Sequence, residues 1–240
     1  MKEKIKKYYS LIIKIIIIVL VLIIFALIGY FIRQNIPMFV VNDIFVKCSV
    51  DGKDVNDVLT ASWNLSLSQI NDVYINFGHI ANPYTFDSNK IYLKSFSVEN
   101  VKIIQNPKIG KNIEMYYINS NNEKIEFEDS IVYNIVSSID NTTENQISIK
   151  GGQIALSFVN DDFIRYLYNN VNELTFDGTL LKPTGILKSD IQFTVSLDIV
   201  FETMSEDKYT YNILLQLPYG NFIENGQYIG DYPFMLNLQK

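Results

Sequence analysis

Residues 191–217 read IQFTVSLDIVFETMSEDKYTYNILLQL, which is the clearest periodic stretch in the chain. Hydrophobic residues occupy every second position from Ile191 to Phe201, with mostly polar residues between them. After the polar residues 204–207 the alternation returns from Tyr209 to Leu217. A period of two places alternate side chains on opposite faces of an extended strand. The stretch therefore predicts a β-hairpin of two long strands, each with one buried face.

Shorter segments of the same kind lie N-terminal to this hairpin. Two apolar faces need a second layer to cover them, so we expect an antiparallel β-sandwich-like domain. The alternative is an α+β fold, in which a sheet packs on helices. Asp51-Gly52 and Gly151-Gly152 have the composition of tight hairpin turns. The further strands are expected at residues 44–50, 73–79, 91–98, 101–104, 113–117, 125–127, 131–139, 146–150 and 153–159.

One short helix is expected within this domain, at residues 161–173. Phe163, Leu167 and Val171 recur at helical spacing. Asp161 and Asp162 precede this stripe and have the side chains that cap a helix and complement its positive end.

Residues 11–32 read LIIKIIIIVLVLIIFALIGYFI and form an apolar segment that is separate from the predicted β-rich domain. The uncharged part, residues 15–32, would span about 27 Å as a helix, close to the thickness of a bilayer core. It is apolar on all sides, which is typical of a membrane-spanning helix and not of an amphipathic surface helix. The alternative is a cleavable signal peptide, but its apolar region is normally shorter and ends at a small-residue cleavage site.

The charges on either side of this segment predict its orientation. Four lysines precede the uncharged region among residues 1–10, whereas Arg33 alone directly follows it. The positive-inside rule therefore places residues 1–10 in the cytoplasm as a basic tail and the rest beyond the membrane. We expect a single-pass protein of the cell membrane with a transmembrane helix at 11–32, a stalk at 33–43 and an extracytoplasmic β-rich domain at 44–240. Membrane lipid would be its partner through residues 11–32.

The outer part of the chain is acidic. Residues 1–32 carry five lysines and one glutamate, a net charge of +4, so the total of −6 leaves −10 on the remainder. A charge of this sign repels phosphate backbones, and we therefore expect no nucleic-acid partner.

Motifs for catalysis, metals and cofactors are lacking. Cys48 and His79 are the only cysteine and the only histidine, which excludes an intrachain disulfide and a site with several histidines. Cys48 falls on the apolar face of the strand at 44–50, where it would behave as a small hydrophobic residue. We expect no catalytic residue, no metal ligand and no cofactor, and hence a protein that is not an enzyme.

The C-terminal region has one feature that could bind a ligand or a partner. Aromatic residues are interleaved there with Gly220, Gly226 and Gly230. Exposed aromatic rings stack on sugars and anchor protein interfaces. The alternative is a final pair of strands whose rings fill the edge of the core. The aromatic residues concerned are Tyr219, Phe222, Tyr228, Tyr232 and Phe234.

These observations favour a non-enzymatic binding or assembly module of a cell-envelope complex, with an envelope protein as partner. A surface domain that binds a sugar or peptide, or that mediates adhesion, is the second hypothesis. An envelope hydrolase that uses carboxylates is the third. The sequence identifies neither the partner nor the oligomeric state.

Overall fold

The computed structural model describes residues 2–35, 38–54, 63–80, 92–110, 112–139, 145–169, 175–235 and 237–239. Side chains are described at residues 12–30 of the N-terminal helix and throughout the later ranges up to residue 235. The chain divides into two compact units, Met1–Pro37 and Met38–Lys240.

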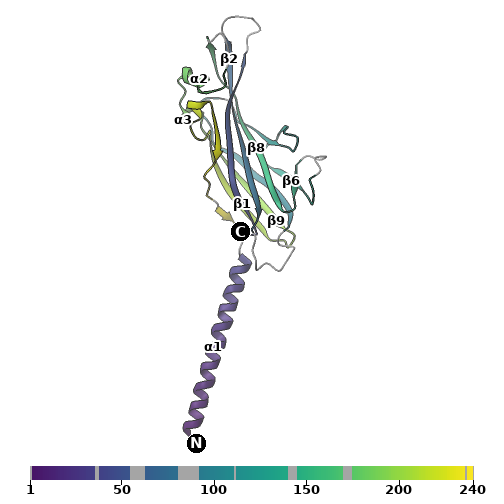
Figure 1. Cartoon of the computed structure of the whole chain (residues 1–240), viewed down its shortest axis with the longest axis vertical. Helices are drawn as coiled ribbons and strands as arrows, with labels where there is room; N and C mark the ends of the chain where they lie inside the picture. The colour runs from purple at the N-terminus through teal and green to yellow at the C-terminus, as the bar shows by residue number, and fades with distance from the viewer. Residues whose placement is uncertain are drawn as a thin grey trace. The chain divides into compact units, whose positions relative to one another are not determined.

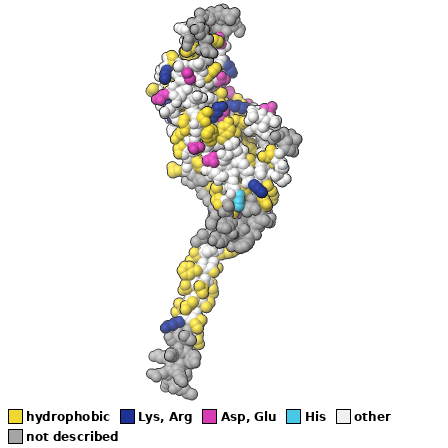
Figure 2. Space-filling model, in the orientation of Figure 1, with side chains coloured by type: hydrophobic (Ala, Val, Ile, Leu, Met, Phe, Trp, Pro, Cys, Tyr) yellow, Lys and Arg dark blue, Asp and Glu magenta, His cyan; other side chains and the backbone are white. Residues whose placement is uncertain are grey.

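The first unit contains helix α1, Lys2–Asn35 (Figure 1). Within it, Ile12–Tyr30 is a run of 19 residues long and apolar enough to cross a membrane. Every side chain in this run is exposed, and Figure 2 shows hydrophobic groups covering the described part of the helix. The core helix of a soluble protein would be mostly buried, whereas no part of this run is.

The second unit contains two six-stranded sheets. In the first sheet all pairs of strands are antiparallel, and β1, β2 and β8 run side by side at its centre (Figure 1). Its strands, in spatial order, are β11 (Gln227–Asp231), β1 (Phe39–Asp54), β2 (Trp63–His79), β8 (Gly151–Tyr168), β4 (Glu114–Ile118) and β5 (Lys124–Glu126).

The second sheet is built around the hairpin predicted at residues 191–217. Its pairs are antiparallel except for the last two strands, which are parallel. In spatial order the strands are β12 (Asn237–Gln239), β10 (Lys208–Leu217), β9 (Phe193–Thr203), β3 (Leu93–Gln105), β6 (Ile131–Val136) and β7 (Gln146–Ser148). The mainly β, sandwich-like fold is thus confirmed.

A cluster of aromatic rings joins the two sheets. Phe77 of the first sheet stacks on Phe96 of the second, with ring centroids 4.2 Å apart. Phe201 of β9 lies 5.2 Å from Phe77 and 6.0 Å from Phe39 of β1, again between centroids. All four side chains are buried, so the core lies between the sheets. Burial of such large rings is the main source of stability in a core.

The alternating patterns are confirmed where the structure describes them. Tyr209 is paired with Phe201 and Leu217 with Phe193 in the β9–β10 hairpin. In β1, Ile44, Val46 and Cys48 are all buried, as the period of two predicted. Met38, Phe39 and Val41 are buried as well, so packed residues begin within the range 33–43 that we expected to be a stalk.

The predicted helix at 161–173 is wrong where it can be compared. Residues up to Tyr168 continue strand β8, and residues 170–174 lie outside the described ranges. A register shift opposite Leu67–Gln69 of β2 accommodates residues 161–163 as a bulge, with Asp162 at φ 48°. The carboxylates that we assigned to a helix cap instead accept hydrogen bonds across the strands: Ser68 donates to Asp161 over 2.5 Å, and Ser66 donates to Asp162.

Both predicted tight turns are also wrong. Asp51 and Gly52 continue β1 and pair with Ser68 and Leu67 of β2. Gly151 and Gly152 begin β8. Because β7 and β8 belong to different sheets, the chain passes here from one layer to the other instead of forming a hairpin.

The two strands expected at 91–98 and 101–104 form one strand, β3. Its pairing with β9 shifts register between Glu99 and Lys102, and Asn100 has a φ of 53°. A bulge of this kind interrupts the alternation in the sequence without ending the strand.

The β unit also contains short helices. They are α2 (Gly178–Leu181), the 3-10 helix η2 (Lys182–Thr184), α3 (Lys188–Ile191) and α4 (Phe222–Asn225). The backbones of α2 and α4 touch: a Cβ on Gly178 would overlap the carbonyl oxygen of Glu224, and one on Gly226 would overlap the carbonyl carbon of Asp177. Leu180 and Phe222 are fully buried beneath this contact, which anchors both helices to the core.

Candidate functional site: a groove beside edge strand β11

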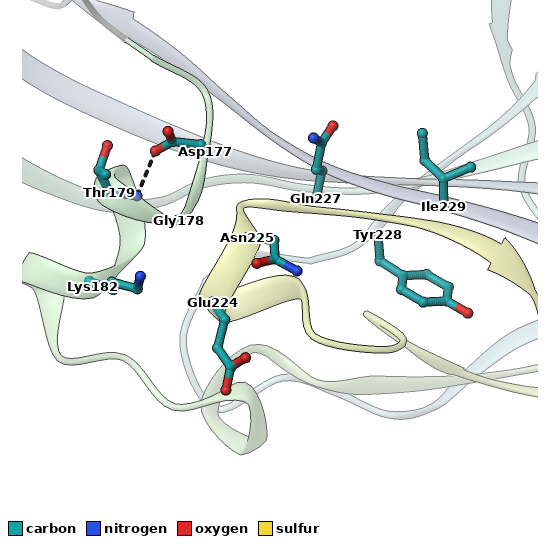
Figure 3. A pocket seen from close by; sticks show the side chains of 9 residues that line it. All are labelled: Asp177, Gly178, Thr179, Lys182, Glu224, Asn225, Gln227, Tyr228 and Ile229. Carbon is teal, nitrogen blue, oxygen red and sulfur yellow. Dashed lines mark hydrogen bonds between the residues drawn. The ribbon is translucent and has the colours of Figure 1, made fainter.

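A groove of about 490 Å³ lies where α2, η2, α4 and β11 meet (Figure 3). Pockets for small ligands have volumes of this order. The groove is open and mixed in character, with acidic, basic, amide and apolar side chains. Its lining residues are Asp177, Gly178, Thr179, Lys182, Glu224, Asn225, Gln227, Tyr228 and Ile229.

Asp177 is held in place by the start of α2. It is the N-cap of this helix, and its carboxylate accepts a hydrogen bond from the Thr179 N–H over 2.7 Å. Hydrogen bonds from the side chain and backbone of Thr179 lower the pKa of Asp177. The group is therefore ionised at neutral pH, and it is unsuited to be the proton donor that a carboxylate hydrolase needs.

Strand β11 forms the opposite side of the groove. Tyr228 points to one side of this strand, whereas Gln227 and Ile229 point to the other (Figure 3). Ile229 is 57% exposed although it is a large apolar residue. The strand is the outermost of its sheet, and β1 is its neighbour on the inner side.

Two of the interleaved glycines of the C-terminal region, Gly220 and Gly230, serve the packing of Tyr228. A Cβ on Gly220, which has a φ of 63°, would overlap the Tyr228 ring. A Cβ on Gly230 would lie 2.7 Å from the Tyr228 hydroxyl oxygen. The ring also contacts Tyr219 edge-on, with centroids 5.3 Å apart. These glycines thus leave room for a half-buried ring.

The five aromatic residues singled out from the sequence do not form one surface. Tyr219 is half-buried between Tyr228 and Tyr232, and Lys188 lies 5.6 Å from its centroid. Phe222 is fully buried, and Tyr232 is buried with its hydroxyl accepting a hydrogen bond from the Gln216 N–H over 2.7 Å. Of the five, Tyr228 is the one that lines the groove. Binding by these residues stays a prediction.

Phe234 lines a second, more apolar hollow of about 320 Å³. Leu214 of β10 and Met235 border it, and their side chains are exposed. The hollow thus shares no lining residue with the groove beside β11.

The remaining residues of the groove were not singled out from the sequence. Glu224 is distant in the chain from Asp177 and Lys182, and it becomes their neighbour only through the contact between α2 and α4. The sequence signal nearest to them is the turn at residues 181–185, where Gly185 has the left-handed conformation that a turn glycine often takes.

A second polar cluster lies between β2, β5 and β8. The Ser157 hydroxyl donates to Asp72 over 2.6 Å, and the Lys124 ammonium donates to Ser157 over 2.8 Å and to Asp72 over 3.3 Å. A serine beside a lysine can be a nucleophile when it reaches a substrate. Ser157 is fully buried and its proton is directed to Asp72, so this cluster ties β5 to the sheet.

Within the described ranges, no three histidine, cysteine, aspartate or glutamate side chains lie together in a way that could hold a metal ion. No family model, curated protein or solved structure matches this chain.

Proposed function

We propose that this chain is a membrane-anchored binding module of a cell-envelope complex. Helix α1 holds it in the cell membrane, with the lysine-rich N-terminus in the cytoplasm, and the β unit binds an envelope protein on the outer side. The observation that carries this proposal is the run Ile12–Tyr30, which is apolar and exposed on all sides. A tether of this kind raises the effective concentration of the β unit near other membrane proteins.

The groove beside β11 supports a binding role for the β unit. It combines charged groups from α2, η2 and α4 with an exposed apolar side chain, Ile229. Protein interfaces commonly surround an apolar contact with polar groups in this way. The net acidity of the outer chain favours a partner with a basic surface.

Cross-linking in intact cells tests this function. A photoreactive amino acid at Gln227, in the groove, is expected to capture an envelope protein. The matched control is the same group at Val132, a strongly exposed position on β6 in the other sheet. Failure to capture any partner from Gln227, from Val132 and from further exposed positions of the β unit would contradict the proposal.

Recognition of a sugar is a second candidate, favoured by the chemistry of the groove lining. Asp177, Glu224, Asn225 and Gln227 supply the acceptors and donors that bind hydroxyl groups, and Tyr228 supplies a ring. Binding of the full-length protein to an array of envelope glycans, lost in the Asp177→Ala and Glu224→Ala variants, would favour this candidate.

A further inference from the structure

The hydrogen-bonding pattern of β11 shows which of its main-chain groups face outward. The Val50 N–H donates to the Gly226 carbonyl over 3.1 Å, and the Tyr232 N–H donates to the Ile44 carbonyl over 2.8 Å. Between these two bonds, Tyr228 and Gly230 are paired with Cys48 and Val46 of β1. In an antiparallel pair the bonded positions alternate. Even-numbered residues of β11 therefore bond to β1, and odd-numbered residues direct their N–H and C=O groups away from it.

In the described part of the chain, these outward groups are not paired with another strand. Gln227 and Ile229 have no main-chain hydrogen bond beyond the sheet, and the Asp231 carbonyl accepts only the Tyr228 hydroxyl, over 3.4 Å. A sheet edge with unpaired main-chain groups is a template for another strand. Natural proteins usually shield such an edge, whereas this one carries the exposed Ile229.

The groove provides space along this edge. Its walls are Gln227, Tyr228 and Ile229 on the β11 side and residues 177–179 with Lys182 on the other. A strand that pairs with β11 would lie about 4.8 Å from it. The two walls are joined where the backbone of Gly178 meets that of Glu224 and the backbone of Gly226 meets that of Asp177.

The charges around the edge indicate the chemistry of the occupant. Asp177 and Glu224 line the groove and Asp231 ends β11, whereas Lys182 is the one basic residue among the described residues of the lining. We propose that an extended segment of a partner protein, with basic side chains at alternate positions, adds to β11 as a seventh strand of the first sheet. This proposal rests on the binding function proposed above and specifies how the partner docks. Main-chain bonds supply the affinity in this mode and side chains the specificity.

Peptide binding to the full-length protein in nanodiscs of zwitterionic lipid tests this mode. The probe is a fluorescent, N-acetylated and C-amidated peptide of sequence Val-Lys-Val-Lys-Val, compared with Val-Glu-Val-Glu-Val and with a form of the lysine peptide that is N-methylated on alternate amides. We expect the lysine peptide to bind and to slow hydrogen exchange at residues 226–232. The N-methylated peptide should bind at least about tenfold more weakly, as loss of one to two hydrogen bonds implies. The glutamate peptide should also bind at least about tenfold more weakly, because its side chains repel the acidic groups at the edge.

A pair of substitutions at one position separates the main chain from the side chain. Ile229→Pro removes an outward N–H without breaking a bond to β1, so the sheet is retained. It should weaken binding of the lysine peptide by at least about tenfold. Ile229→Val keeps the N–H and the branched side chain and should change binding by less than about twofold. Asp177→Asn should weaken the lysine peptide more than the glutamate peptide.

Several outcomes would overturn this mode of docking. The first is that the lysine peptide does not bind. The second is that its N-methylated form binds with the same affinity as the unmodified peptide. The third is that the Ile229→Pro variant binds the lysine peptide as tightly as the original protein does. Cross-linking through residue 229 to a second copy of this chain alone would assign the edge to self-association instead.

If a photoreactive group at Val132 captures an envelope protein but one at residue 229 does not, the binding function stands and strand addition fails. If neither position nor any other captures a partner, the function itself fails.

Discussion

Cys48 shows how the surroundings of one residue suppress its chemistry. The thiol is fully buried on the inner face of β1, and the Tyr219 N–H donates to its sulfur over 3.4 Å. Burial raises the pKa of Cys48 to about 11. Because of this high pKa, little thiolate, which is the reactive form, exists near neutral pH.

The first prediction follows for the reactivity of this thiol. A disulfide reagent such as DTNB should label Cys48 of the native protein at pH 8 at least about a hundredfold more slowly than a model thiol of ordinary pKa, because both the fraction of thiolate and access are reduced. In denaturant, labelling should proceed at the rate of the model thiol. Rapid labelling of the native protein would show that the inner face of β1 is accessible.

Two glycines with nearly equal backbone angles provide the second prediction. Gly226 and Gly185 have φ values of 69° and 68°. A Cβ at Gly226 would overlap Asp177, whereas a Cβ at Gly185 would meet no atom within 4 Å. Gly185→Ala should therefore cost only the strain of a left-handed residue, about 1–2 kcal/mol of unfolding free energy.

Gly226→Ala carries the same strain and must also push α2 away from α4, which adds about 1–3 kcal/mol. Chemical denaturation of both variants measures this difference. Equal unfolding free energies would mean that α2 and α4 are not held against each other. A larger loss in Gly185→Ala would contradict the packing described for α2 and α4.

At the scale of elements, the two sheets are joined through Phe201 of β9. Its ring lies within 6.0 Å, between centroids, of Phe39, Phe77, Phe96 and Tyr211. Phe201→Ala should lower the unfolding free energy by about 3–5 kcal/mol, since it removes a buried ring and leaves a cavity. Val132→Ala, at a position 70% exposed on β6, should change it by no more than about 0.5 kcal/mol. Thermal and denaturant unfolding of both variants check this third prediction, and similar losses would argue against a core between the sheets.

Elements were predicted well where one face is buried and poorly where strand pairing overrides local preference. Phe163 and Leu167 have helical spacing, yet Phe163 is buried in β8 and Leu167 is exposed. Strand β2 begins as early as Trp63, and its residues 63–67 pair with residues 164–168 of β8. These pairs satisfy the backbone of both strands, which the weak preference of a short helix cannot match.

For the whole molecule, the division into two units leads to the fourth prediction. Residues 38–240 contain their own core, so this fragment without α1 should be soluble and should unfold cooperatively. Full-length protein should stay in the membrane fraction after an alkaline wash, because the run Ile12–Tyr30 needs an apolar environment. Circular dichroism of the fragment and immunoblots of washed membranes measure these outcomes. Release of the full-length chain by the wash would contradict a spanning helix.

The sequence by itself determined the apolar helix and the β-rich class of the fold, because both depend on the periodicity of hydrophobic residues within a continuous segment. Tertiary structure alone decided which strands are neighbours, where the bulge at residues 161–163 lies, and that β7 and β8 belong to different sheets. It also brought Asp177, Lys182 and Glu224 beside β11, the outermost described strand of the first sheet. Their proximity depends on strand pairing and backbone contact between distant segments, and periodicity within one segment carries no information about such pairs.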